Sequence, residues 1–472
     1  MFVSCYFKCL AYLWHHKNID MFKSIITLFF SVSVLLLSAQ NHQINGTIAG
    51  LADEEVYLLR ILGQNRTIVD TAKSDPSGSF TFTLEEGFPV GMYAIIYGPA
   101  QPLELIYNHE NIRFTSGGPS TQVPVQIIES VENLIYYDYL FLKGYNLYKM
   151  DLLEPLLQTY PKDDAFYQTL LKEYDQLGKQ IQERVETLTT ENPNTIASHF
   201  IRADSPLYVD PALSPEMKQQ FQRSHYFDMT DFTDTLLMRS NVLTSKVIGY
   251  LSLFQNKEMS KEEMESSLLI GVDTILDKAM VDQQVYEFVI DFLIDGFQAV
   301  GFERGLEYVA EQNQLEQFCE NTERKAELAD KMELIKKLAI GKTAPDFTTT
   351  DLNGKKITLS EIQAKKVVLV FWASWCPHCD ELLPELKNYY DPLNTGDLEI
   401  IAVSVDKEKS DVLTSIDSGS YNWINIAALQ GWDGPVVLEY GIAATPTIFI
   451  LDENKTIIGK PGNKFELKKM LE

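Results

Sequence analysis

The stretch Trp375-Cys376-Pro377-His378-Cys379 decides the fold of the last part of this 472-residue chain. It follows an apolar run, residues 367–372, that is typical of a buried strand, and it precedes a helix-like segment. Two cysteines separated by two residues can close a small disulfide. At a helix N-terminus, unpaired backbone N–H groups stabilise the thiolate of the first cysteine. A strand–CxxC–helix unit therefore predicts a reactive dithiol.

Strand and helix patterns alternate around this unit, from residue 339 to residue 472. Strands are predicted at 367–372, 398–405, 446–451 and 455–459, and helices at 377–390, 407–418 and 464–471. This order indicates a βαβ start followed by a hairpin at residues 452–455. We expect an α/β domain in which helices flank a mixed sheet.

A CxxC pair also occurs in zinc sites, so the two interpretations must be separated. Structural zinc has about four ligands, and neither a second CxxC nor a closely spaced histidine pair accompanies Cys376 and Cys379. The surrounding residues are more specific than the pair itself. Pro384 follows five residues after Cys379, and Thr445-Pro446 opens an apolar strand. We therefore expect no metal.

Two further domains are predicted before residue 339. Residues 41–122 show short strands separated by turns, with strict alternation at 79–84, and predict an N-terminal antiparallel β-sandwich. Residues 123–338 change to helical spacing and predict a central α-helical domain. The stretch Tyr136-Tyr137-Asp138-Tyr139 allows two interpretations, a binding surface or a core and interface stripe, and the second is favoured. Neither domain shows a catalytic pattern.

Residues 1–40 are predicted to be an upstream extension followed by a signal peptide. Lys23 precedes an apolar run at 25–37 that is short for a bilayer span. Ser38 and Ala39 then supply the small residues typical of a signal-peptide cleavage site. We expect the true start at Met21, cleavage near Ala39 and export to the periplasm or cell envelope. An uncleaved anchor is the alternative.

Charge and cysteine count narrow the expected partners. A formal net charge of −26 argues against nucleic acid and anionic lipid. After cleavage three cysteines remain, Cys319, Cys376 and Cys379, which is no disulfide framework. Cys319 is predicted to be a buried packing residue. We expect Cys376 and Cys379 to take part in thiol–disulfide exchange rather than to stabilise the fold. We expect no cofactor beyond their own redox-active disulfide.

Residues 339–472 closely resemble the thioredoxin superfamily. Within it they are similar to exported TlpA/ResA-like thiol–disulfide oxidoreductases of the redoxin/AhpC-TSA group. The residues that carry this narrower resemblance are Gly341–Phe347, Phe371–Cys379 and Val403–Asp406. The preceding segments resemble the N-terminal extension of unknown function common in Bacteroidota thioredoxin-like proteins. The resemblance implies a C-terminal α/β thioredoxin fold.

The resemblance also implies a role for each site residue. Cys376 is the exposed nucleophile that attacks a substrate disulfide, and Cys379 is the resolving thiol. Pro446 is the cis-proline facing the cysteines, and the Thr445 backbone offers hydrogen bonds to the partner. Five of the implied residues shape the site around the cysteines rather than react. They are Trp375 at the apolar rim, Pro377 and His378 between the cysteines, and Thr445-Pro446 opposite them.

The sequence departs from the family where a general base is expected. The buried acid of thioredoxin falls at Val370, and the glutamate of many TlpA/ResA-like proteins falls at Leu382. Glu381 is a candidate acid, but on a helix it points about 100° away from that position. How Cys379 is deprotonated stays open.

The resemblance implies an enzyme, a thiol:disulfide oxidoreductase that exchanges with envelope protein thiols and disulfides. We expect a reductase supplied by a membrane electron donor, for example in cytochrome c maturation or envelope redox homeostasis. Pro377-His378 resembles the oxidising DsbA-type centre and leaves the direction open. Two alternatives are a binding or scaffold protein with a regulatory dithiol, and a thiol peroxidase. Peroxidases need a threonine where Ala373 stands.

Overall fold

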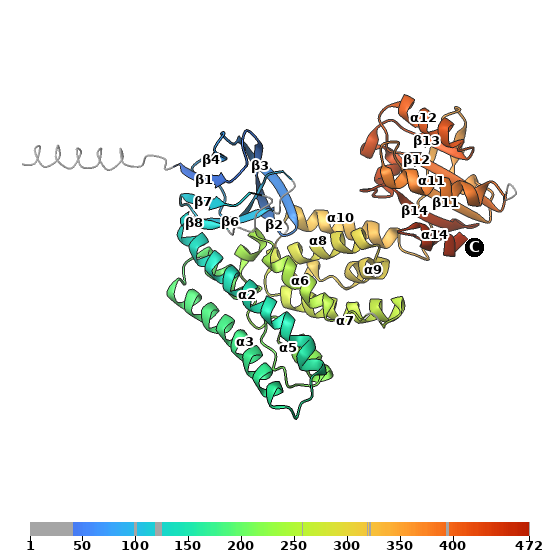
Figure 1. Cartoon of the computed structure of the whole chain (residues 1–472). Coiled ribbons are helices and arrows are strands. Elements are labelled where there is room, and N and C mark those ends of the chain that lie inside the picture. Colours follow the sequence, from blue (N-terminus) through green and yellow to red (C-terminus); the bar gives the residue numbers. More distant parts are fainter. Residues whose placement is uncertain are drawn as a thin grey trace, which may run out of the picture. The chain divides into compact units, whose positions relative to one another are not determined.

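The computed structural model describes residues 41–98, 102–118, 125–256, 258–318, 320, 322–392 and 396–471 (Figure 1). The predicted signal peptide and Cys319 lie outside these residues. The chain divides into two compact units, one made mainly of residues up to Phe221 and the other mainly of residues from Thr244 on. Within the described ranges, no helix combines the length and apolar character needed to cross a bilayer.

The first unit begins with eight strands in two four-stranded sheets, ordered β4-β1-β7-β8 and β3-β2-β5-β6. The strands are β1 (His42–Ile48), β2 (Glu55–Leu62), β3 (Asn65–Lys73), β4 (Ser79–Leu84), β5 (Gly91–Ile96), β6 (Leu103–Tyr107), β7 (Ile112–Ser116) and β8 (Gln126–Glu129). Side chains from both sheets, such as Phe82 and Tyr93, form one hydrophobic cluster. The pairing of β1 with β7 is parallel, so the predicted antiparallel arrangement is wrong for this pair. The chain passes through the second sheet between these two strands, and no hairpin forces them to run in opposite directions.

Four helices follow these strands (Figure 1), and the last of them extends past Phe221, where the main segment of the first unit ends. They are α2 (Val131–Thr159), α3 (Ala165–Glu191), α4 (Ile196–Asp204) and α5 (Pro215–His225). The long helices α2 and α3 pack against each other. Ser130 and Asp164 begin them as N-caps, each accepting a backbone N–H of the first turn through its side-chain oxygen. These caps explain why each helix begins where the sequence pattern changes.

Glu132 joins α2 to the start of α4. Its buried carboxylate accepts the backbone N–H groups of Ile196 (3.1 Å) and Ala197 (2.7 Å). It also accepts the side-chain amide of Asn108 (2.6 Å). A carboxylate at a helix N-terminus satisfies N–H groups that have no partner inside the helix. Glu132 therefore fixes α4 against α2.

The second unit contains a helical part and an α/β part. A short 3-10 helix, Thr235–Arg239, and α6 (Val242–Ser252) lie where the chain passes from one unit to the other. The helices that follow are α7 (Lys261–Ala279), α8 (Gln283–Val300), α9 (Glu303–Gln312), the 3-10 turn Leu315–Gln317, and α10 (Glu323–Lys337). Ser260, Asp282 and Thr322 cap α7, α8 and α10.

The C-terminal α/β part has the predicted thioredoxin-like fold. Its strands are β9 (Thr348–Thr350), β10 (Lys356–Thr358), β11 (Lys366–Trp372), β12 (Leu398–Ser404), β13 (Ile424–Ala427), β14 (Thr447–Asp452) and β15 (Ile457–Gly459). Its helices are α11 (Pro377–Tyr390), α12 (Lys409–Gly419), α13 (Pro435–Glu439) and α14 (Lys464–Leu471), with 3-10 turns at Leu359–Glu361 and Gly431–Asp433. The main sheet has the order β13-β12-β11-β14-β15. Strands β11, β12 and β13 are parallel, whereas β14 and β15 join antiparallel.

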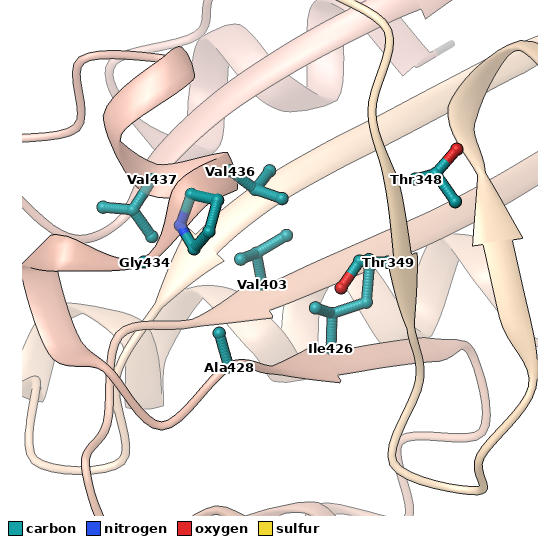
Figure 2. A pocket seen from close by; sticks show the side chains of 9 residues that line it. Thr348, Thr349, Val403, Ile426, Ala428, Gly434, Val436 and Val437 are labelled. Atoms are coloured by element: carbon teal, nitrogen blue, oxygen red, sulfur yellow. The ribbon is translucent and has the colours of Figure 1, made fainter.

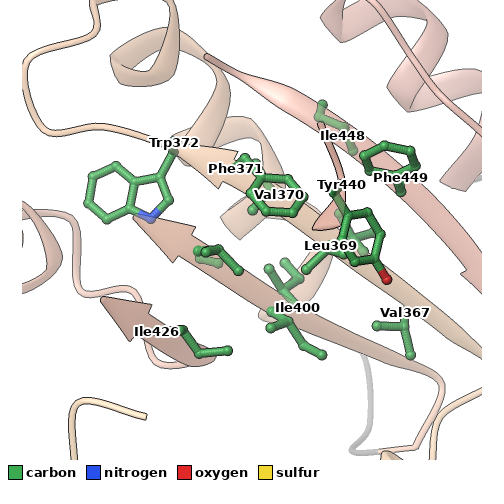
Figure 3. Close-up of a cluster of buried hydrophobic side chains, with 14 of the residues drawn as sticks. Val367, Leu369, Val370, Phe371, Trp372, Ile400, Ile426, Tyr440, Ile448 and Phe449 are labelled. Carbon is green, nitrogen blue, oxygen red and sulfur yellow. The ribbon is translucent and has the colours of Figure 1, made fainter. Parts of the chain in front are cut away.

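From Val367 to Trp372, strand β11 is buried on both faces, which explains the unbroken apolar sequence of these residues. Figure 3 shows its side chains among those of β12, β14 and the loop residue Tyr440. The Tyr440 ring contacts Phe371 and Phe449 at centroid distances of 5.5 and 5.3 Å. This core fixes the end of β11, and the CxxC stretch follows directly from that end.

Candidate active site

The two cysteines lie where β11 ends and α11 begins. Cys376 is the N-cap of α11, and Pro377 takes the first helical position, where the missing N–H has no cost. Cys379 is one turn further on. Cys376 is 4% exposed, Cys379 is fully buried, and both are free thiols. The expectation of an exposed nucleophile is therefore wrong in degree: Cys376 is nearly buried, because the Thr445 loop lies against its sulfur, although Cys379 is buried more completely.

The Cys376 sulfur lies against the loop that carries Thr445 and Pro446. Its thiol donates to the Thr445 carbonyl oxygen at 3.2 Å, and the predicted cis peptide between Thr445 and Pro446 is present. Burial raises the pKa of Cys376, but hydrogen bonds outweigh this effect. They come from the Thr445 side chain, the Cys379 thiol and the backbone N–H groups of His378 and Cys379. The pKa of Cys376 therefore lies below the ordinary thiol value.

Cys379 has the opposite electrostatic environment. Burial, and next the hydrogen bond and charge of Cys376, raise its pKa to about 12, although the backbone N–H of Ala373 opposes the shift. Since the thiolate is the nucleophile, Cys376 is suited to attack a disulfide first. Cys379 is suited to act only once Cys376 has been oxidised by the partner.

This pair predicts strongly unequal alkylation rates. Near neutral pH, iodoacetamide should modify Cys376 much faster than Cys379, because a thiol with a lowered pKa holds far more thiolate than one whose pKa is raised to about 12. The Cys376 rate should rise with pH and level off below the ordinary thiol pKa. Tandem mass spectrometry of the wild-type protein locates the modification on each cysteine, so that each thiol keeps the neighbour that shifts its pKa. Denatured protein is the control, in which both rates should be equal; equal rates in the folded protein would contradict the assignment.

An exposed aromatic rim surrounds Cys376. Trp375 is 59% exposed, and its ring packs edge-on against Trp432 with centroids 6.3 Å apart. Pro377 and His378 are exposed beside it. Trp432 belongs to the 3-10 turn Gly431–Asp433, more than fifty residues away in sequence. No motif marked it, because an isolated tryptophan in a loop has no periodic pattern.

The structure places no acid at the two positions where the family suggests one. Val370 is fully buried in the core and Leu382 is 5% exposed, both among apolar neighbours. Glu381 lies on the exposed side of α11. None of these three residues therefore offers a buried carboxylate to Cys379.

A buried carboxylate that sequence reasoning left without a role is Asp406, just after β12. It is 2% exposed and accepts the backbone N–H of Ser374 (3.0 Å) and the hydroxyls of Ser374 and Ser404 (both 2.6 Å). The neighbouring Ala373 contacts both cysteines. Its carbonyl accepts the Cys376 N–H at 3.3 Å, and its own N–H donates to the Cys379 sulfur. Asp406 therefore holds the turn that positions the dithiol.

Asp406→Asn should slow the Cys379-dependent release of a mixed disulfide about tenfold, since a charge-assisted hydrogen bond of 1.5–3 kcal/mol is lost. Loss of the negative charge alone would favour thiolate formation and speed this step. Slower release would therefore indicate that Asp406 positions the dithiol, whereas faster release would indicate that only its charge matters. Stopped-flow release from a mixed disulfide on Cys376 measures it. Asp411→Asn, on the surface of α12, is the control, and unchanged or faster release in Asp406→Asn would contradict the positioning role.

A small cavity lies near the carboxyl ends of β12 and β13 (Figure 2). Its volume is about 80 Å³, and its lining residues are Thr348, Thr349, Val403, Ile426, Ala428 and Gly434–Val437. Pockets for organic cofactors usually measure about 300–1,000 Å³, so this cavity does not fit one. Among the residues that the structure describes, no three His, Cys, Asp or Glu side chains gather as a metal site requires.

Known proteins are similar to this chain over its C-terminal part. The AhpC/TSA family model matches residues 340–460. Thiol-disulfide oxidoreductase ResA of Bacillus thuringiensis subsp. konkukian is 34% identical over 122 residues, which are 26% of this chain and 69% of that protein. The chain belongs to the TlpA/ResA-like thiol:disulfide oxidoreductases. ResA of Geobacillus thermodenitrificans is 32% identical over 138 residues, 29% of this chain and 78% of that protein.

Solved structures from the genus Bacteroides are similar as well. The thioredoxin domain of a thiol-disulfide oxidoreductase from Bacteroides vulgatus is 25% identical, covers 29% of this chain and 99% of its own length, and has a TM-score of 0.26. A thioredoxin-like protein from Bacteroides caccae is 21% identical, covers 56% of this chain and 96% of its own, and has a TM-score of 0.42. The family assignment follows from the ResA relatives, and it identifies this TlpA/ResA-like chain as an enzyme.

Proposed function

We propose that this oxidoreductase is exported and reduces disulfides of cell-envelope proteins, with apocytochromes c among the substrates. The observation that carries the proposal is the pair of opposite thiol environments, a reactive Cys376 beside the Thr445 carbonyl and a buried Cys379 behind it. An extended substrate chain beside Thr445 would bring its own disulfide to Cys376.

The exchange needs two steps. The Cys376 thiolate attacks a substrate sulfur, an S–S bond forms to Cys376, and the other substrate sulfur leaves as a thiolate that takes up a proton. Cys379 then loses its proton and attacks the Cys376 sulfur. The substrate departs as a dithiol. It has gained two electrons from Cys376 and Cys379, which are now joined as a disulfide. The pair is its own redox group, and no further cofactor enters.

The cellular setting of the proposal comes from residues 1–40 and from charge. The basic residue, apolar run and small residues at the cleavage site favour export by a cleavable signal peptide. A membrane electron donor would then return the Cys376–Cys379 disulfide to the dithiol. A net charge of −26 favours protein partners over nucleic acid.

A trapping experiment tests the proposal. Cys379→Ser keeps the attacking thiol but lacks the resolving one, so mixed disulfides should accumulate on Cys376 and be released by reductant. Proteins captured in the producing cell are identified by mass spectrometry. The double variant Cys376→Ser/Cys379→Ser is the control and should capture none of them. Failure to capture any envelope protein on Cys376 would remove the main support for the proposal.

The direction of exchange has a separate test. A reduction potential near the thioredoxin value of about −270 mV supports a reductase, whereas one near about −120 mV supports an oxidase. Equilibration with glutathione buffers, read by alkylation of the free thiols, gives this value. A potential near the oxidising end would overturn the reductase assignment and leave the exchange chemistry intact.

A further inference from the structure

Helix α2 carries an apolar stripe on its exposed side. The stripe consists of Leu134, Phe141, Tyr145, Tyr148, Leu152 and Leu156, and its three aromatic side chains are 69%, 58% and 63% exposed in this order. Spacings of seven, four, three, four and four residues keep all six on one helix face. The buried residues of α2, among them Ile135 and Tyr139, lie on the opposite face. An isolated surface helix would have a polar outer face, so this stripe points to a partner.

The stripe has the size of a stable interface. Given the dimensions of aromatic and leucine side chains, its exposed area is about 700 Å². This exceeds the patch of about 300–600 Å² that is the largest on a typical monomer. It is close to the roughly 800 Å² that each partner contributes to a standard protein–protein interface.

The charges next to the stripe have partners within the same chain. Asp138 pairs with Arg184, and the Lys149 ammonium lies 2.9 Å from the Glu173 carboxylate. Both partners belong to α3. Covering the stripe therefore leaves neither of these charges buried without a counterion, which would be costly.

The order of the side chains in the stripe identifies the occupant. Aromatic residues occupy its middle, and leucines occupy both ends. Reversing the helix about Tyr145 brings Leu134 onto Leu156 and Phe141 close to Tyr148. It also brings Leu152 onto Asp138, whose charge is paired with Arg184. A two-fold interface requires this kind of self-complementary surface, in which each residue meets its symmetry counterpart. The net charge of −26 also disfavours an anionic membrane surface.

We propose that the stripe is a homodimer interface, in which α2 helices of two copies pack antiparallel about a two-fold axis near Tyr145. Sedimentation velocity of the chain, purified from cells expressing the full-length sequence, should show a dimer at micromolar concentration and physiological salt. Tyr145→Lys places two ammonium groups at the axis and should raise the dimer dissociation constant at least about 100-fold, because like charges in an interface cost several kcal/mol.

The matched control is Val300→Lys, which changes an exposed apolar residue on α8 (76% exposed). It should leave the dimer intact, and thermal unfolding should show that both variants are folded. A monomeric wild-type protein would overturn the proposal, as would a Tyr145→Lys dimer of unchanged affinity. If the monomer floats with phosphatidylcholine vesicles, the stripe is a lipid-binding surface instead.

Cross-linking tests the antiparallel geometry. In a background of Cys376→Ser/Cys379→Ser, chains with Leu134→Cys are mixed with chains with Leu156→Cys and oxidised. A disulfide between the two kinds of chain should form, and the parent without added cysteines should not form it. A disulfide between two Leu134→Cys chains in place of the mixed one would indicate parallel packing and overturn the model.

Discussion

Replacement of Cys376 by serine should abolish reduction of a protein disulfide, with a fall in rate of at least about 1,000-fold, since a serine hydroxyl is not ionised near neutral pH and cannot replace the thiolate nucleophile. The inner thiol does not compensate, because Cys379 is fully buried and its pKa is raised to about 12. Turbidity of a reduced model protein measures the rate.

The matched control for this experiment is Cys319→Ser, which removes the remaining cysteine beyond the predicted signal peptide. This variant should retain the wild-type rate. Activity that survives in Cys376→Ser but is lost in Cys319→Ser would show that the exchange chemistry has been assigned to the wrong thiol.

Glu132→Ala should destabilise the first unit by about 3 kcal/mol, because removal of a buried acceptor strands the donors that it satisfied. Two of these donors are the backbone N–H groups of Ile196 and Ala197 at the start of α4. Urea unfolding measures the loss, and hydrogen exchange of the same two amides should accelerate locally.

Two variants make the Glu132 prediction specific. Glu132→Gln keeps one acceptor oxygen and should lose less stability than the alanine variant. Glu154→Ala removes an exposed carboxylate from the same helix and should change stability by less than about 0.5 kcal/mol. Equal losses in Glu132→Ala and Glu154→Ala would show that the capping contact is not what stabilises α4.

The sequence was most informative where chemistry and periodicity coincide. The run before Trp372 is apolar at every position, because β11 is buried on both faces. The CxxC stretch then marks the turn into α11, and Thr445-Pro446 marks the loop opposite. Together these three local signals carried the resemblance to the thioredoxin superfamily, and that resemblance implied that Cys376, Cys379 and Pro446 belong to one site.

Elements without an apolar pattern escaped prediction. Strand β3 lies at a sheet edge with nearly all its side chains exposed. Its backbone hydrogen bonds to β2, rather than buried side chains, make it a strand. Arg66, Asp70 and Lys73 along it suit an edge that must not pair with other chains. Asp406 was visible as part of a family motif, but its role depends on hydrogen bonds to Ser374, 32 residues earlier. Sequence spacing does not reveal such contacts.

The raised pKa of Cys379 makes the lifetime of the mixed disulfide on Cys376 depend on pH. Below that pKa, each unit of pH changes the population of its thiolate tenfold. In the mixed disulfide the Cys376 thiol no longer contributes to the shift, but burial still keeps the Cys379 thiolate scarce, and resolution proceeds only from that thiolate. Each captured protein therefore stays attached for a period that shortens about tenfold per unit of rising pH. A lower pH would therefore prolong this attachment.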